Sequence, residues 1–321
     1  MSIWIYIIKR MMSAIPILLI VSIISFFLIR LSPVDPLAQL KLNPSISKET
    51  VEKETKRLGL DKPLIIQYFI WFKNFSTGDM GYCIDNTKVS TKIKPRILNT
   101  LLLSICTIFL SWIIAIPLGV LGAVFYNSKF DKLLTIFSSI GMAIPSFFFA
   151  ILMLLFAQKT GWFPPGGLTS VNFNEMNLLD KFIDVIWHII LPVFVLTTIS
   201  LSSMTRQMRA NLLEVLNSEY VKYAYAKGLS KSKVIIKHAL RNAINPIITL
   251  LGFEFAGLLS GAALTEYVFQ YPGLGKLILE AVLQSDINLV MASLMIGAFM
   301  LVCGNILADI LLKITDPRVR I

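Results

Sequence analysis

The residue types that most often carry chemistry are few in this sequence and lie far apart. The cysteines are Cys83, Cys106 and Cys303, and the histidines are His188 and His238. A zinc site or a disulfide framework places its residues at short, regular spacings, and these residues offer no such spacing. We therefore expect neither a metal centre nor an intrachain disulfide.

The segment Gly273-Leu274-Gly275-Lys276-Leu277 has the Gly-Lys pair of a phosphate-binding loop but lacks its other residues. Leu277 stands where Ser or Thr would be required, and no glycine lies five residues before Gly275. We therefore expect no nucleotide or other cofactor to bind to this chain.

One acidic residue, Glu254, lies in the middle of an apolar stretch. An ionisable group is expensive there and is a functional candidate by default. Two interpretations stay open: Glu254 contacts substrate in a translocation path, or it is a protonated group bonded between helices. An intramembrane enzyme would need polar partners on facing spans, and no His, Asp or Lys stands at a comparable depth. We therefore expect a protein without enzymatic activity of its own.

Composition identifies the solvent in which the chain folds. Of its 321 residues 55% are hydrophobic and only 15% are charged, whereas soluble domains carry about 25% charged residues. The net charge is +11, but its placement matters more than its total. We expect a lipid bilayer as the environment and no nucleic acid as partner.

Long charge-free stretches predict the membrane spans, because a helix needs about 20 apolar residues to cross roughly 30 Å of hydrocarbon. Five stretches lack Asp, Glu, Lys and Arg, and a sixth is interrupted only by Glu254. In chain order these stretches are 11–29, 97–128, 133–158, 185–205, 242–265 and 287–308. The sequence thus predicts an all-α integral membrane protein with six transmembrane helices. Pro145 and two other prolines inside the spans would bend them.

The basic residues predict the orientation, since short cytoplasmic loops are rich in Lys and Arg. Lys129 and Lys132 follow the second span, the block 206–241 after the fourth span is strongly basic, and Lys313 lies near the C-terminus. Both termini are therefore expected in the cytoplasm. The organisation is then 1–29 for the N-terminus and first span, 30–96 for a small extracytoplasmic domain, and 97–321 for the core.

The segment 30–96 has helix signals of its own. Ser47 can cap a helix that ends near Gly59, and Pro63 can open a second, aromatic helix that contains Tyr68 and Trp71. Such a domain could cap the outer face or contact a ligand, and both interpretations stay open.

The block 206–241 is punctuated as helix, glycine turn, helix. Ser218 can cap the first helix, Gly228 stands where a left-handed residue would end it, and Ser230 can cap the second. An apolar patch is expected on the first helix and its turn, made of Tyr220, Val221, Ala224 and Leu229. That patch could lie on anionic lipid or fit a groove of a soluble partner.

At these residues the sequence resembles a known family. The stretch Glu219-Tyr220-Val221 through Ala226-Lys227-Gly228, followed by His238-Ala239-Leu240-Arg241-Asn242, is similar to the cytoplasmic coupling loop of ABC importer permeases of the dipeptide, oligopeptide and nickel subfamily. Further blocks resemble that subfamily: Leu58-Gly59-Leu60-Asp61-Lys62-Pro63, Gly78-Asp79-Met80-Gly81, Tyr271-Pro272-Gly273-Leu274-Gly275 and Asp316-Pro317-Arg318.

The resemblance implies a division of labour. Such permeases pair with a second permease to form the path, two cytoplasmic ATPases dock on the loops, and an extracytoplasmic binding protein delivers the substrate. It places the chain in the bacterial cytoplasmic membrane as a multi-pass protein. The residues that it implies for coupling to the ATPases are Glu219, Tyr220, Val221, Ala224, Ala226, Lys227, Gly228, Leu229, His238, Arg241 and Asn242.

The cargo implied by the resemblance is a di- or oligopeptide, with nickel or a metal chelate as the alternative. A self-sufficient channel or secondary transporter is the alternative from another class. Dependence of uptake on ATP and on two ATPases would separate that class from the importer.

Overall fold

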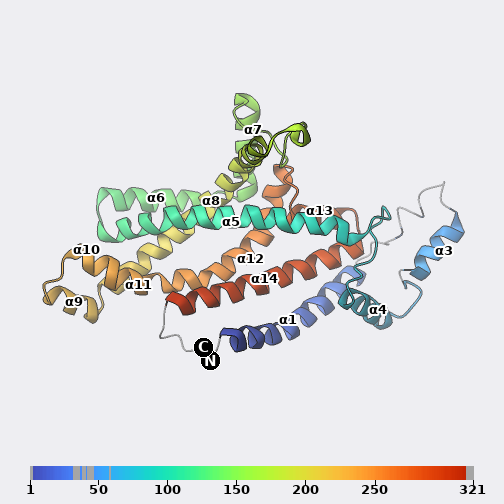
Figure 1. The fold of residues 1–321 in the computed structure, drawn as a ribbon, viewed down its shortest axis with the longest axis horizontal. Coiled ribbons are helices and arrows are strands. Elements are labelled where there is room, and N and C mark those ends of the chain that lie inside the picture. Colours follow the sequence, from blue (N-terminus) through green and yellow to red (C-terminus); the bar gives the residue numbers. More distant parts are fainter. Residues whose placement is uncertain (1–2, 32–36, 38–40, 42–46, 58, 316–321) are drawn as a thin grey trace.

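The computed structural model describes residues 3–31, 37, 41, 47–57 and 59–315, and the regular elements in these ranges are helices joined by loops (Figure 1). The predicted all-α class is confirmed. The block Asp316-Pro317-Arg318 lies outside the described residues. The elements are α1 (Ile3–Leu31), α3 (Lys48–Arg57), α4 (Leu64–Ser76), α5 (Val89–Val124), α6 (Lys129–Ala143), α7 (Ser146–Thr160), the 3-10 turn η1 (Phe173–Glu175), α8 (Leu178–Leu216), α9 (Glu219–Ala226), α10 (Lys231–Lys233), the π-helix η2 (Val234–Ala239), α11 (Leu240–Ala243), α12 (Asn245–Val268), α13 (Leu274–Leu283) and α14 (Ile287–Thr315).

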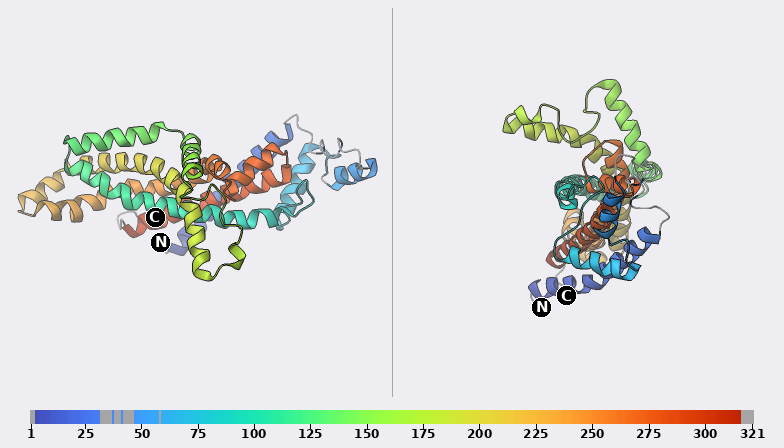
Figure 2. Two further views of the ribbon diagram at one scale, coloured as in Figure 1. Left: turned by 90° about the horizontal axis from the view of Figure 1, so that it is seen from above. Right: turned by 90° about the vertical axis from the view of Figure 1, so that its right-hand side faces the viewer.

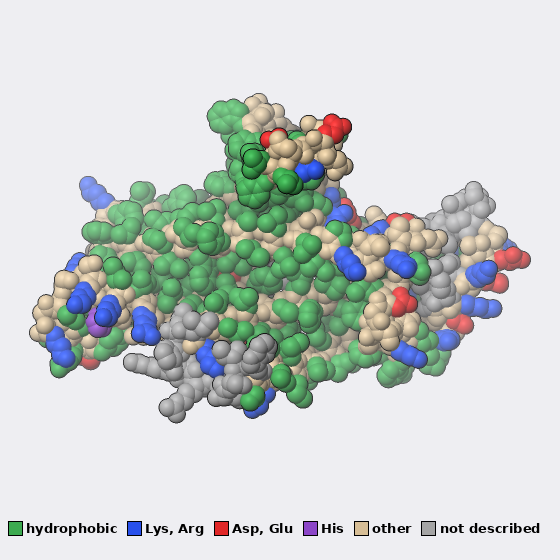
Figure 3. All heavy atoms as spheres, viewed as in Figure 1, with side chains coloured by type: hydrophobic (Ala, Val, Ile, Leu, Met, Phe, Trp, Pro, Cys, Tyr) green, Lys and Arg blue, Asp and Glu red, His purple; other side chains and the backbone are tan. Residues whose placement is uncertain are grey.

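Four helices in the described part of the chain are long and apolar enough to cross a membrane. They contain the spans Ile7–Leu31, Val89–Val124, Leu178–Leu216 and Ile287–Lys313. A fifth span exists if α6 and α7 together form one bent span. Hydrophobic side chains cover the middle of the molecule, and charged side chains gather toward its two ends (Figure 3). The chain is therefore a multi-pass integral membrane protein.

The third predicted span, 133–158, is not one straight helix. The axes of α6 and α7 differ by 95° across a short break. Ile144, just before Pro145, is extended with φ −83° and ψ 121°, which is the conformation that a following proline imposes. Pro117 and Pro192, in contrast, lie inside the continuous helices α5 and α8.

The helix α8 runs well beyond the predicted span 185–205, because it is 39 residues long. A charge-free stretch reports only the part of a helix that suits lipid, and polar residues can continue the same helix into water. The first part of the block 206–241, up to Leu216, is therefore the end of α8. The helix α5 likewise begins at Val89, ahead of the charge-free stretch 97–128.

The core lies between α5 and α8, which run side by side and are packed closely (Figures 1 and 2). At Gly119 of α5 an added Cβ would lie 2.6 Å from the Met208 side chain of α8. Only glycine fits at such a separation, so the helix backbones can approach one another. Asp131 of α6 and Arg209 of α8 form an ion pair in which Nη2 to Oδ2 measures 2.8 Å, and the Asp131 side chain is 4% exposed.

The helix α1 packs antiparallel against α14. Arg10, near the start of α1, forms an ion pair of 3.0 Å with Asp309, near the end of α14. At the other end Phe26 of α1 packs with Met291 of α14 and with Tyr68 of α4. The start of α1 and the end of α14 therefore lie at the same end of the molecule (Figure 1).

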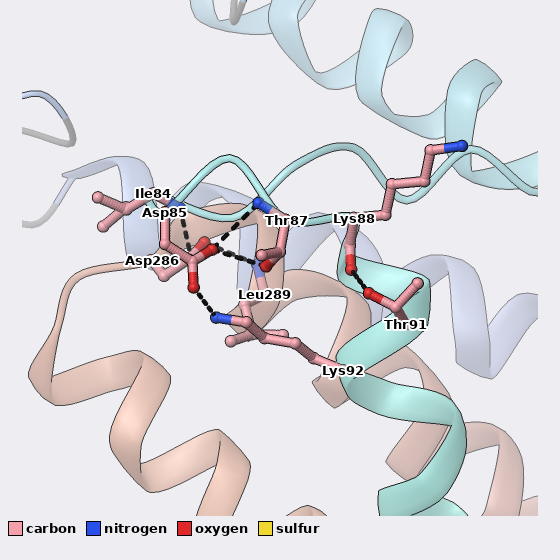
Figure 4. A network of polar contacts seen from close by, with 8 residues as sticks. All are labelled: Ile84, Asp85, Thr87, Lys88, Thr91, Lys92, Asp286 and Leu289. Carbon is pink, nitrogen blue, oxygen red and sulfur yellow. Dashed lines mark hydrogen bonds and ion pairs between the residues drawn. The ribbon is translucent and has the colours of Figure 1, made fainter.

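The predicted helices within 30–96 are confirmed. Ser47 accepts a hydrogen bond of 3.3 Å from the Thr50 amide at the start of α3, and Pro63 directly precedes α4. A loop after α4 is then fixed to the start of α14 (Figure 4). The Asp286 carboxylate accepts the Ile84 and Leu289 amides, at 3.0 and 3.1 Å.

The same loop forms an ion pair with the first turn of α5. The Lys92 ammonium donates a hydrogen bond of 2.6 Å to Asp85 (Figure 4). This bond, with one from Thr87, lowers the pKa of Asp85 to about 2.

An arm projects sideways from the long helices. It consists of α7, η1 and the first turns of α8, and it stands away from the axis of α5 (Figure 2). Large apolar side chains on it are exposed, namely Trp162, Leu178, Leu179, Phe182 and Ile183. The loop between α7 and η1 is fixed to α8 by Asp184. Its carboxylate accepts hydrogen bonds from the Ser170 amide at 2.8 Å and from the Ser170 hydroxyl at 2.5 Å.

Candidate functional site

The helix, glycine turn, helix pattern predicted for 218–241 is confirmed. The helix α9 ends before Gly228, whose φ of +79° is left-handed, and the Gly228 amide donates to the Tyr225 carbonyl at 2.9 Å. No atom would lie within 4 Å of a Cβ added at Gly228. Glycine is therefore required there by the backbone conformation and not by packing.

The predicted cap of α9 is wrong in its side chain. Ser218 has the extended backbone of an N-cap, but its hydroxyl donates back to the Val215 carbonyl at 2.5 Å instead of accepting from the helix. Because α8 ends only two residues earlier, a free carbonyl lies within reach of this hydroxyl. Ser230 likewise precedes α10 without a side-chain cap.

The apolar patch predicted on the first helix and its turn is only partly exposed. Val221 and Ala224 are buried in a cluster with Met208 and Leu212 of α8, while Leu229 packs partly against that cluster. Tyr220 is exposed as predicted. The burial follows from α9 folding back onto the end of α8, a tertiary contact that the local sequence does not encode.

The loop formed by α9 to α11 has an exposed surface that is aromatic and basic. The side chains that present it are Tyr220, Tyr223, Tyr225, Lys227 and Ile236. The Lys227 ammonium lies 4.7 Å from the centroid of the Tyr223 ring. Three tyrosines at positions 220, 223 and 225 are a signal in the sequence that could have predicted this surface.

The two halves of the loop, α9 and the segment from α10 to α11, are joined by a hydrogen bond. The Asn242 amide donates a hydrogen bond of 2.7 Å to the Tyr220 hydroxyl, which brings together two residues of the predicted set. Glu219 pairs with Lys222 at 2.8 Å, and Ala226 and Arg241 are exposed. His238 is half-buried and makes no side-chain hydrogen bond within the described part of the chain.

The second half of the loop, from α10 to α11, contains a π-helix that sequence patterns did not predict. It spans Val234–Ala239 and buries Val234, Ile235 and Ala239. Such a widened turn is rare and occurs frequently at functional sites. The Asn211 amide of α8 then donates to the Ala243 carbonyl of α11 at 3.3 Å, so both halves of the loop are fixed to α8.

Glu254 of α12 is bonded to two other helices. Its carboxylate accepts hydrogen bonds from the Trp112 indole of α5 at 3.2 Å and from the Ser200 hydroxyl of α8 at 2.9 Å. The residue is half-buried. Glu254 therefore lies where α5, α8 and α12 meet, and its hydrogen bonds join α12 to the other two helices.

A second carboxylate, Glu266, is fully buried near the end of α12 and was not predicted as a site. It accepts hydrogen bonds from the Thr100 hydroxyl at 2.9 Å and from the Lys276 amide at 2.8 Å. The Lys276 amide lies in the first turn of α13, where a negative charge is favourable. The helix α13 (Leu274–Leu283) is thus buried on one face, and Glu266 holds its first turn in place.

No cluster of three or more His, Cys, Asp or Glu side chains suited to a metal ion occurs among the described residues. The fold and these contacts define a helical membrane protein whose buried polar groups join helices to one another.

Two family descriptions match the chain. "Binding-protein-dependent transport system inner membrane component" covers residues 115–321, and "Binding-prot-dependent transport system membrane comp, N-term" covers residues 3–102. The chain belongs to this family of binding-protein-dependent transport permeases, as the resemblance implied. The family is a transport component of ABC systems and not a catalytic enzyme.

Curated relatives match over nearly the whole chain. An oligopeptide transport system permease protein, AppB of Bacillus subtilis, is 42% identical over 317 residues, which are 98% of each chain. A dipeptide transport system permease protein, DppB of Alkalihalophilus pseudofirmus, is 33% identical, and an oligopeptide permease protein, OppB of Haemophilus influenzae, is 34% identical. Each of these two alignments covers 98% of this chain and 99% of the relative.

Proposed function

We propose that this chain is one of two permease subunits of an ATP-driven importer of di- or oligopeptides in the bacterial cytoplasmic membrane. The observation that carries the proposal is full-length similarity to permeases named for peptides. Competitive uptake of labelled peptides against nickel, in a strain that lacks the chain, tests the cargo. Uptake of nickel alone would favour the metal alternative, and uptake that persists after ATP depletion would favour a self-sufficient transporter.

The proposed topology has six spans with both termini in the cytoplasm. The helix α12 completes the six as the fifth span in chain order, since its 24 residues cover the required thickness. The ion pair between Arg10 and Asp309 supports this topology, because it joins the start of α1 to the end of α14. The basic tip formed by α9 and α10 lies at one end of the molecule (Figure 3), as expected for a cytoplasmic loop.

The proposed partners divide the chemistry. Two cytoplasmic ATPases bind ATP and Mg and dock on the loop formed by α9 to α11. The exposed tyrosines of this loop provide an aromatic contact surface. Because Val221 and Ala224 pack on α8, a movement of the docked loop moves that helix as well. The second permease covers the exposed apolar arm at α7 and α8, and a substrate-binding protein docks on the side that carries the segment 30–96.

Gly228→Val is expected to reduce peptide uptake by about 5- to 30-fold. A β-branched residue in the left-handed conformation adds roughly 1–2 kcal/mol of strain, which would distort the end of α9. Uptake and ATP hydrolysis are measured together in reconstituted transporter, and we expect uptake to fall more than hydrolysis.

Gly161→Val is the matched control. Gly161 also ends a helix with a left-handed φ of +67°, and a Cβ there would meet no atom within 4 Å. It carries the same strain at the end of α7, outside the proposed ATPase contact. Equal losses in both variants, or full uptake by Gly228→Val, would rule out the proposed role of the loop.

Glu254 is proposed to line the translocation path as well as to join helices, because its position among α5, α8 and α12 leaves it half-buried. Glu254→Gln is expected to reduce uptake of peptides with a free amino terminus by about tenfold, the loss of one charge-assisted contact. Uptake of N-acetylated peptides should change less. Equal changes for both peptide series would leave Glu254 a structural residue only.

A further inference from the structure

A polar pocket of about 270 Å³ opens near the end of α1, away from the loop and from Glu254. It lies between α1, α4, the loop after α4 and the start of α14. Its polar lining includes Arg30, Gln67, Trp71, Asn74, Asp79 and Asn288. Nothing in the proposed transport mechanism uses this pocket.

Three buried polar atoms of this lining lack a hydrogen-bond partner within the described structure. They are Nε of Arg30, Nε1 of Trp71 and Oε1 of Gln67. Gln67 is 7% exposed, and its amide nitrogen already donates to the Lys62 carbonyl at 2.7 Å. Buried polar groups are nearly always hydrogen-bonded, so unpaired ones around a cavity indicate a site for a polar ligand.

The unpaired atoms specify the chemistry of that ligand. Arg30 pairs with no carboxylate among the described residues, and its guanidinium lies over the Phe26 ring at 5.6 Å. Together with the Trp71 indole it offers two N–H donors beside a positive charge, which suits an anionic oxygen group such as phosphate. The Gln67 oxygen and the Asp79 carboxylate suit an ammonium or hydroxyl donor on the same ligand.

The pocket lies where phospholipid headgroups would be found. The helix α1 has no charged residue between Met11 and Ile29, and it ends one residue after Arg30. Beside it, α4 exposes Ile65 by 63% and Phe69 by 62%. Exposed apolar side chains beside a Trp and an Arg are typical of a helix at the membrane interface.

We propose that this pocket binds the phosphate-bearing headgroup of a phospholipid, in the leaflet at the C-terminal end of α1. The phosphate accepts from Arg30 and Trp71, and the terminal ammonium or hydroxyl of the headgroup donates to Gln67. The acyl chains extend along the exposed apolar surface of α1. Bound lipid would thereby fix α4 to the membrane surface, independently of the identity of the transported cargo.

The test is binding of phosphatidylethanolamine to the purified, assembled transporter, followed by native mass spectrometry during titration in detergent. Arg30→Gln is expected to weaken binding at one site by about tenfold or more, and Trp71→Phe by about three- to tenfold. Lys73→Gln is the matched control, since Lys73 is an exposed cation of α4 that does not line the pocket. It should bind as the unaltered protein does.

Two further ligands identify the source of the recognised group. Glycerophosphoethanolamine has the headgroup without acyl chains, and diacylglycerol has the chains without phosphate, so each should bind much more weakly than the phospholipid. Equal binding of either ligand, or equal lipid binding by all variants, would overturn the proposal. Trp71→Phe retains a ring that can stack on Phe75, as Trp71 does at 5.3 Å, and size-exclusion chromatography verifies its assembly.

Discussion

Asp131→Asn is expected to destabilise the protein by about 3–5 kcal/mol, because it breaks a buried ion pair and leaves the Arg209 charge without its partner. The Asp131 carboxylate accepts two bonds from Arg209, at 2.5 and 2.8 Å, and a third from the Asn127 amide at 2.8 Å. An asparagine oxygen can still accept from Asn127 but cannot neutralise the guanidinium. The measurement is the midpoint of thermal unfolding in detergent.

Two companions make this result specific. Asp85→Asn applies the same chemical change to the pair with Lys92, where the Asp85 side chain is 53% exposed. Exposed pairs contribute about 0–1 kcal/mol, so the unfolding midpoint should hardly move. The double variant Asp131→Asn with Arg209→Met removes the unpaired charge and should recover part of the loss. A small effect of Asp131→Asn alone would show that the pair contributes little.

Gly273→Ala is expected to produce the second large effect, a destabilisation of about 3 kcal/mol or more. A Cβ at Gly273 would overlap the Glu266 carboxylate, which is fully buried. The added methyl must displace that carboxylate from the Thr100 hydroxyl and the Lys276 amide, so overpacking combines with the loss of buried charge-assisted hydrogen bonds.

Gly297→Ala is the control for this substitution. Gly297 lies inside α14, and a Cβ there would meet no atom within 4 Å. Because alanine favours a helix over glycine by roughly 1 kcal/mol, this variant should be neutral or slightly stabilised in the same unfolding measurement. Equal stability of Gly273→Ala and Gly297→Ala would mean that the corner between α12 and α13 can relax, which contradicts the packing described above.

Features that depend on neighbouring residues could be predicted well from the sequence. The apolar runs located the long helices, and Ser47, Pro63 and Gly228 marked helix ends correctly because capping and backbone conformation are local. The block beginning at Glu219 was enough to indicate the family. The angle at Pro145 was less predictable, since proline ends a helix but does not determine the direction of the next one.

Contacts between distant parts of the chain could not be predicted in this way. Asp131 and Arg209 are 78 positions apart, and Ile84 and Asp286 are 202 positions apart. Which charges pair, and which face of α9 turns inward, depends on how the long helices pack.

The sequence by itself therefore determined the solvent, the position of the long apolar helices and the class of protein, since apolar run length and helix punctuation are properties of short segments. Only the tertiary structure decided that Glu266 is buried against Thr100, that Val221 faces α8, and that Arg30, Gln67 and Trp71 surround one pocket. The physical reason is that burial and pairing are set by the packing of segments, and packing joins residues that no local pattern connects.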